Sequence, residues 1–155
     1  MTLRYKNTYT GLLAAVLLVL FAAGCTRNNG NIGSLFGTWH LSSLEIDGEE
    51  AADYEDNCFW LFQNNIISFV TLDDPEDHTA LRRWGTFERD GGNLILDLSH
   101  HGAGNNDYLY SPPAFLRLPR EKSVCLKIVS DNGSRMVLTY NAAEGDVMTY
   151  TLIKQ

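Results

Sequence analysis

The residues of this chain that could carry acid, base or metal chemistry lie in its longer polar segments. His100 and His101 are adjacent, and Asp107 follows shortly after them. Neighbouring side chains on an extended chain point to opposite sides, and no third or fourth ligand has a convincing spacing, so the pair does not make a tetrahedral metal site. The pattern favours solvated loop residues over metal ligands.

Two other patterns also lack the spacing that their chemistry needs. The acidic stretch 73–77 has neither the alternating ligands nor the glycine of a calcium loop. A Gly-x-Ser-x-Gly elbow, which would single out a serine nucleophile, is missing from the sequence. Nothing supplies a paired acid and base, so we assign no catalytic residue and no cofactor, and we expect a protein that is not an enzyme.

The first cysteine ends a leader. Arg4 and Lys6 precede an apolar run over residues 12–21, and Ala22-Ala23-Gly24 lead directly to Cys25. The run is shorter than the ~20 apolar residues of a membrane span, and a charged start with small residues before the cut indicates a secretory signal over residues 1–24. The junction resembles a bacterial lipobox, which implies an acylated Cys25; ordinary secretion with a free cysteine is the alternative.

Acylation of Cys25 would fix the protein to a membrane, because several acyl chains anchor where one chain holds only marginally. Thr26 occupies the position where an Asp retains some bacterial lipoproteins in the inner membrane, and no acidic run follows it. The resemblance therefore implies an outer-membrane lipoprotein facing the periplasm, with exposure on the cell surface as the alternative.

Cys58 and Cys125 are the thiols that remain. An oxidising compartment permits a disulfide between them, but a bridge needs Cα atoms within about 7 Å, which a clean barrel would not offer across its width. Both cysteines lie near the start of predicted strands that descend from the same end of the fold. The sequence leaves open a disulfide or two buried free thiols.

Composition limits the classes of partner. Removing residues 1–24 takes away two basic residues and no acid, so the formal net charge moves from −7 to −9. Such a surface does not favour phosphates, which argues against nucleic-acid binding. Of the 155 residues 131 remain, enough for one domain. Residues 25–34 are small and polar and read as a flexible tether, which leaves 35–155 for the fold; the oligomeric state stays open.

Short strands are the predicted secondary structure of the domain. Apolar, β-branched or aromatic runs occur at 36–46, 57–63, 66–72, 83–89, 94–99, 123–130, 135–141 and 147–153. Several alternate with period two, such as Leu94-x-Leu96-x-Leu98, which is typical of strands. We predict an all-β fold: an antiparallel up-and-down barrel of eight strands, with 114–118 as a candidate ninth and at most a helical turn or two in 48–56 or 74–82.

The connections predict two different ends. Residues 64–65, 90–93 and 131–134 are short turn-formers, whereas 47–56, 73–82 and 100–122 are long. In an up-and-down barrel these two sets lie at opposite ends, so the long loops should surround one mouth, as in ligand-binding barrels. Insertions without a function would give the same pattern. The candidate ligand contacts are Tyr54, Trp60, Phe62, His78, Trp84, Leu96, Tyr108 and Tyr110.

The first predicted strand carries the most specific motif. Gly37-Thr38-Trp39 brings a residue without a Cβ next to the largest apolar side chain, a combination that plugs a barrel end. Gly-x-Trp at this position resembles the lipocalins, in which a basic residue lies over the Trp; Lys154 or Arg135 would take that place here. The chain is also similar to small lipocalin-like lipoproteins of gut Bacteroidales, from the lipidated Cys to a later Trp-Gly-Thr-Phe at residues 84–87.

Two functions follow as hypotheses. The first is a membrane-anchored protein that binds a small apolar or amphipathic ligand at the long-loop end. The second is a protein-interaction or protease-inhibitor module, favoured if side chains fill the barrel. Eight strands lie near the size at which an interior is either filled or able to hold one small ligand, so both remain open.

Overall fold

The computed structural model describes residues 33–74 and 79–155. The predicted leader, Cys25, most of the predicted tether and His78 lie outside the described residues. Ser34, which we placed in the tether, is already hydrogen-bonded to the barrel through Asp131 and Lys154. Within the described residues, no helix is long and apolar enough to cross a membrane.

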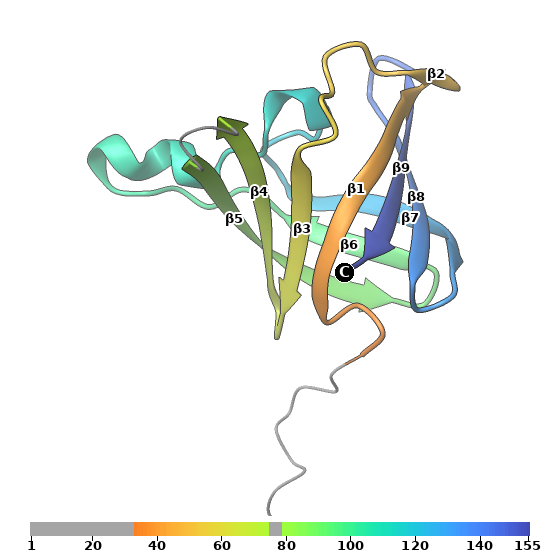
Figure 1. The fold of residues 1–155 in the computed structure, drawn as a ribbon. Helices are drawn as coiled ribbons and strands as arrows, with labels where there is room; N and C mark the ends of the chain where they lie inside the picture. Colours follow the sequence, from red (N-terminus) through yellow and green to blue (C-terminus); the bar gives the residue numbers. More distant parts are fainter. Residues whose placement is uncertain (1–32, 75–78) are drawn as a thin grey trace, which may run out of the picture. The chain divides into compact units, whose positions relative to one another are not determined.

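The described chain forms a closed antiparallel barrel, as predicted (Figure 1). The first strand β1 pairs with β3, the strands from β3 to β9 pair in chain order, and β1 pairs with β9 to close the sheet. The strands are β1 (Gly37–Ile46), β2 (Glu49–Glu50), β3 (Cys58–Gln63), β4 (Ile66–Asp74), β5 (Thr79–Asp90), β6 (Asn93–Asp97), β7 (Lys122–Asp131), β8 (Arg135–Asn141) and β9 (Val147–Lys154).

The ninth strand is not where the sequence suggested. Residues 114–118 contain the short 3-10 helix η2 (Ala114–Leu116), which follows Pro112 and Pro113. The extra strand is β2, which pairs with the end of β1 beyond the main barrel. The suggested helical turns in 48–56 and 74–82 are also wrong for the described residues, because β2 and the start of β5 occupy parts of these ranges.

Alternation explains which strand faces build the core. In β3 the residues Cys58, Trp60 and Phe62 are buried while those between them are half-buried or exposed. Leu94, Leu96 and Leu98 show the same alternation in and after β6. Successive side chains of a strand point to opposite faces, so one set from every main strand meets inside the barrel.

The two ends differ as expected for most connections (Figure 1), but the predicted long connection at 73–82 is wrong, because β4 runs to Asp74 and pairs there with Thr79, the first residue of β5. The tight turns after β3, β5 and β7 lie at one end, which we call the tight-turn end. The connections after β1 and β6, the end of β4 with the start of β5, and the turn before β9 lie at the other, the loop end.

The wall is incomplete beside β5. This strand pairs with β4 from Thr79 to Thr86, but with β6 only from Thr86 to Asp90. The connection after β6 instead turns outward into the 3-10 helix η1 (Gly104–Tyr110), which lies against β5 (Figure 1). The sequence therefore places a loop, not a strand, along the upper half of β5.

Candidate functional site

The barrel interior is filled by its own side chains. Trp60 is at the centre, with ring centroids 5.0 Å from Phe69, 5.5 Å from Tyr150 and 6.4 Å from Phe62. Trp39, Trp60, Leu96 and Tyr150 each have 0 % exposure. These side chains have no surface open to a water-sized space, so they pack against one another and leave no room for a ligand at the centre of the barrel.

The ends of the core are held by hydrogen bonds. The Tyr150 hydroxyl donates to the carbonyl of Leu116 at 2.6 Å, and the Tyr54 hydroxyl donates to the carbonyl of Leu41. Burial raises the pKa of both phenols well above the ordinary value. Tyr54, which we predicted as a ligand contact, therefore ties the connection after β1 to the barrel and packs against Phe115.

The tight-turn end is plugged as the Gly-x-Trp motif predicted. The Trp39 indole Nε1 donates to the carbonyl of Leu35 at 2.7 Å, and Lys154 Nζ lies 5.3 Å from the centre of the Trp39 ring. Gly37 has φ +123°, and a Cβ there would lie 3.3 Å from Lys154 Cε. The motif thus needs glycine because the aliphatic part of the Lys154 side chain crosses the backbone at Gly37. Of the two basic residues proposed to lie over Trp39, Lys154 and Arg135, the structure has Lys154 in that place.

The two thiols are not joined. Cys58 faces the core and is buried, whereas Cys125 faces outward and is exposed, and both are free. A disulfide would need both side chains on one face, so the bridged alternative is wrong. The other alternative, two buried free thiols, is right for Cys58 and wrong for Cys125. Burial raises the pKa of the Cys58 thiol to about 12.

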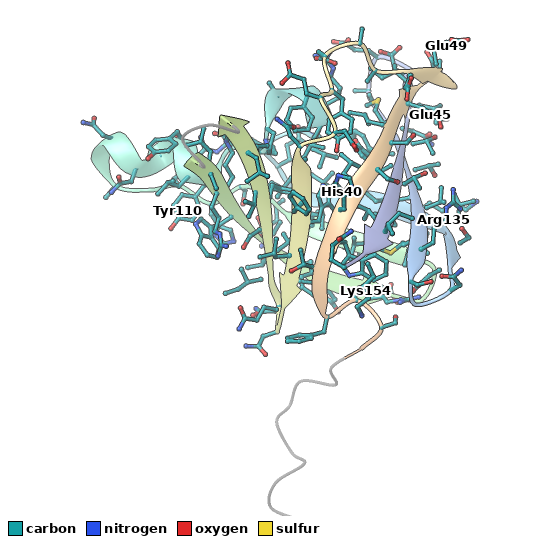
Figure 2. All side chains as sticks on the ribbon, in the orientation of Figure 1. His40, Glu45, Glu49, Tyr110, Arg135 and Lys154 are labelled. Atoms are coloured by element: carbon teal, nitrogen blue, oxygen red, sulfur yellow. The ribbon has the colours of Figure 1, made fainter. Side chains whose placement is uncertain are left out.

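An open apolar groove lies outside the barrel, where η1 leaves the wall. Its volume is about 310 Å³, and its lining residues come from β4, β5 and the connection after β6: Ile66, Trp84, Gly85, Thr86, His100 and Tyr110. Trp84 forms part of the floor, with the guanidinium carbon of Arg82 5.3 Å from its ring centre. His100 and Tyr110 pack together with ring centroids 6.4 Å apart. Figure 2 shows Tyr110 beside β5.

The groove can form because β5 carries glycine at this point. A Cβ on Gly85 would lie 2.6 Å from the Leu98 side chain and 2.9 Å from the Asp97 carbonyl. Leu98 therefore lies against the β5 backbone itself, and the chain can leave the wall directly after it. Gly85 thus sets where the connection diverges from β5 and where the groove opens.

An ion pair holds the outer side of the groove. Arg120 donates two hydrogen bonds of 2.6 Å to the Asp107 carboxylate, and its NH2 also donates to the His100 carbonyl at 2.7 Å. The Arg120 guanidinium keeps the pKa of Asp107 well below its usual range. His101 Nδ1 also contacts Asp107, at 3.1 Å. The two histidines thus diverge, one toward Asp107 and one toward the groove, and no three candidate metal ligands gather among the described residues.

A second, polar hollow of about 240 Å³ lies at the loop end, lined by Asp53, Glu55, Asn57, Thr71, Arg83, Pro113, Ala114 and Phe115. Arg83 shares the inner face of β5 with Gly85, and its NH1 donates to the Thr71 hydroxyl at 3.4 Å. This hollow is the mouth that the turn pattern predicted, but buried side chains close it off below.

The structure distributes the predicted ligand contacts over several places. Trp60, Phe62 and Leu96 belong to the solid core, and Tyr54 packs against it. Tyr108 is 53 % exposed on η1 and does not line the groove. Among the predicted contacts that the structure describes, Trp84 and Tyr110 line the groove together. Sequence reasoning missed Ile66, Gly85 and Thr86, and the Trp-Gly-Thr run at 84–86 was the available signal.

Comparisons with known proteins agree with this geometry. The model of the family described as "Lipocalin-like domain" matches residues 18–146. A lipocalin-like protein from Bacteroides uniformis is similar in structure, with a TM-score of 0.54 at 18 % identity over 79 % of this chain and 100 % of that one. An uncharacterized protein from Bacteroides eggerthii gives a TM-score of 0.52 at 15 % identity over 78 % of this chain and 99 % of that one. A comparison with curated proteins gave no match.

At these identities the two structures support the fold alone, whereas the family match covers most of the chain. Together with the closed barrel and the Gly37, Trp39 and Lys154 plug, the match identifies the chain as a member of the lipocalin-like domain family.

Proposed function

We propose that this chain is a membrane-tethered binding protein, not an enzyme, and that its small apolar ligand lies in the outer groove between β5 and η1. The observation that carries the proposal is the contrast between a filled interior and an open apolar groove of about 310 Å³. That volume lies at the lower end of small-molecule sites. The ligand would therefore lie against the wall of the barrel and not in its centre.

The lining indicates the kind of ligand. Trp84, Ile66 and Tyr110 offer apolar area, while the Thr86 hydroxyl, the Tyr110 hydroxyl and the exposed His100 ring add polar groups at the edge. Aromatic side chains favour flat or chain-like apolar molecules, and a few polar groups fix their orientation. The sequence of residues 22–25 supports acylation of Cys25 at the outer membrane as the means of tethering.

Intrinsic fluorescence tests the groove. The chain has three tryptophans, of which Trp39 and Trp60 have 0 % exposure, so only Trp84 can meet a quencher or ligand directly. We expect the apolar dye N-phenyl-1-naphthylamine to bind the mature chain and to protect Trp84 from acrylamide. A Trp84→Phe variant should lose the acrylamide-sensitive emission.

Two tyrosines of η1 form a matched pair. Tyr110 lines the groove, whereas Tyr108 is on the same 3-10 helix but outside it. Tyr110→Ala should weaken dye binding by about 1–2 kcal/mol, or roughly five- to thirty-fold, through lost apolar contact. Tyr108→Ala should leave it unchanged. Equal effects of the two substitutions, or no dye binding at all, would refute the groove as the site.

The second candidate is a protein-interaction module, which the filled interior favours. Leu72 and Leu81 add exposed apolar surface at 42 % and 38 % exposure near the loop end of β4 and β5. Native mass spectrometry of the mature chain after exposure to a lipid extract separates the two candidates. A retained small molecule supports the binding protein, and its absence supports the interaction module.

A further inference from the structure

The chain enters the barrel at the tight-turn end. Lys154 Nζ donates to the Ser34 carbonyl at 2.9 Å, and Arg89 NH1 donates to the Ser34 hydroxyl at 2.9 Å and to Asp131 at 2.9 Å. Ser34 also donates to Asp131 at 3.2 Å. These contacts fix the first residues of the fold beside the turn between β7 and β8.

The distance from this point to Cys25 is short. Residue numbers 25 and 34 differ by nine, and a chain spans at most about 3.5 Å per residue in any conformation, or about 30 Å over this segment. The opposite, loop end of the barrel is farther from Ser34 by the length of a strand such as β1. If Cys25 is acylated, the segment before Ser34 keeps the tight-turn end within about 30 Å of the membrane.

Charge differs strongly between the two ends. The loop end carries more acids than bases: the acids are Asp47, Glu49, Glu50, Asp53, Glu55, Asp56, Glu121, Glu144 and Asp146, and the bases are Arg83, Arg117, Arg120 and Lys122. At the tight-turn end, Arg89, Lys127, Arg135 and Lys154 outnumber Glu88, Asp90 and Asp131. In Figure 2, Lys154 lies toward the end where the described chain begins, and Glu45 and Glu49 lie toward the other. An anionic surface would repel one end and not the other.

Apolar side chains also project from the tight-turn end. Phe36 is 43 % exposed directly beside the entry point, and Val129 is 57 % exposed in β7, close to the turn before β8. Val129 lies at a β-bulge, where the register between β7 and β8 shifts. Exposed apolar side chains at the same end of a fold as basic residues are typical of surfaces that contact the lipid headgroup region.

We propose that the tight-turn end, through Phe36, Lys127, Val129 and Arg135, docks on the anionic lipid surface of the membrane that holds Cys25. This inference rests on the tethering part of the proposed function. Docking directs the loop end and the open side of the fold away from the bilayer. The barrel then has a defined orientation on the membrane.

Vesicle binding tests the docking apart from the anchoring. The mature chain with Cys25→Ser cannot be acylated, so its sedimentation with vesicles reports the protein surface alone. We expect it to bind phosphatidylcholine vesicles containing phosphatidylglycerol better than phosphatidylcholine vesicles at low salt. Lys127→Gln should lower the partition about fivefold, since one basic residue near an anionic membrane contributes about that factor. Phe36→Ser should lower it as well.

Each variant has a control at the other end. Lys122 and Lys127 are both exposed, but Lys122 begins β7 at the loop end, whereas Lys127 lies in the middle of β7 beside Asn93, the first residue of β6. Lys122→Gln therefore removes the same charge and should change the partition little. Tyr108→Ser is the matching control for Phe36→Ser. Equal effects of the paired variants, or equal binding to both kinds of vesicle, would overturn the docking proposal. Failure of the anchor would show separately, as an unmodified Cys25 in the intact mass of the wild-type protein.

Discussion

Replacing Gly37 tests why the first strand begins as it does. Ala at φ +123° costs about 1–3 kcal/mol in backbone strain. Its Cβ would also approach Lys154 Cε to 3.3 Å and displace the lysine, which weakens a hydrogen bond to Ser34 worth about 1 kcal/mol and a contact with the Trp39 ring worth about 0.5–1 kcal/mol. We expect Gly37→Ala to lose about 3 kcal/mol, a large share of the roughly 5–15 kcal/mol of a typical domain.

Urea unfolding followed by tryptophan fluorescence measures this loss. With a slope of about 2 kcal/mol per molar urea, the midpoint should fall by about 1.5 M. Gly91 is the control, since it has φ +55° and an added Cβ would meet nothing within 4 Å. Gly91→Ala should lose only the cost of the left-handed backbone, about 1–2 kcal/mol. If the two variants lost the same free energy, the contact between Lys154 and Gly37 would contribute nothing and the reasoning would be refuted.

Three further outcomes follow from the site and the core. Ellman's reagent should react with Cys125 in the native mature chain and with Cys58 only after unfolding; two protected thiols would contradict the outward orientation of Cys125. The free energy of unfolding should fall as the pH rises from about 9 toward 12, because the Cys58 thiol ionises in the unfolded chain while its pKa in the native protein stays near 12. Cys58→Ala should make the free energy of unfolding depend less on pH in this range. Arg120→Gln should speed hydrogen exchange over residues 99–111 and weaken dye binding. Because the pKa of Asp107 is lowered, its ion pair with Arg120 should persist above pH 4 and be lost only in strong acid. If hydrogen exchange were unchanged in the Arg120→Gln variant, the ion pair would not be what holds residues 99–111 in place.

Much of the fold could be predicted because strands and turns leave local signals. The alternation of Trp60 and Phe62 with Cys58 identified the inner face of β3, and the Asn and Gly pairs identified the tight-turn end. The same alternation also argued against the disulfide: Val124 and Leu126 face inward, so Cys125 between them must face outward.

The candidate site could not be predicted in the same way, because it depends on where a long connection leaves the barrel. The sequence gives no period for residues 98–121, so nothing indicated that His100 and Tyr110 would return to Trp84. The filled interior was also beyond sequence reasoning, since an eight-stranded barrel can be solid or hollow depending on side-chain volume. Trp60, Phe69 and Tyr150 decide it through their mutual packing.

The central claim is that the ligand binds outside a solid barrel. A crystal structure of the mature chain with N-phenyl-1-naphthylamine tests this most directly. We expect density for the dye between Trp84, His100 and Tyr110, with Trp39, Trp60 and Tyr150 unmoved. Dye density among Trp60, Phe69 and Tyr150, with these side chains displaced to admit it, would contradict the account.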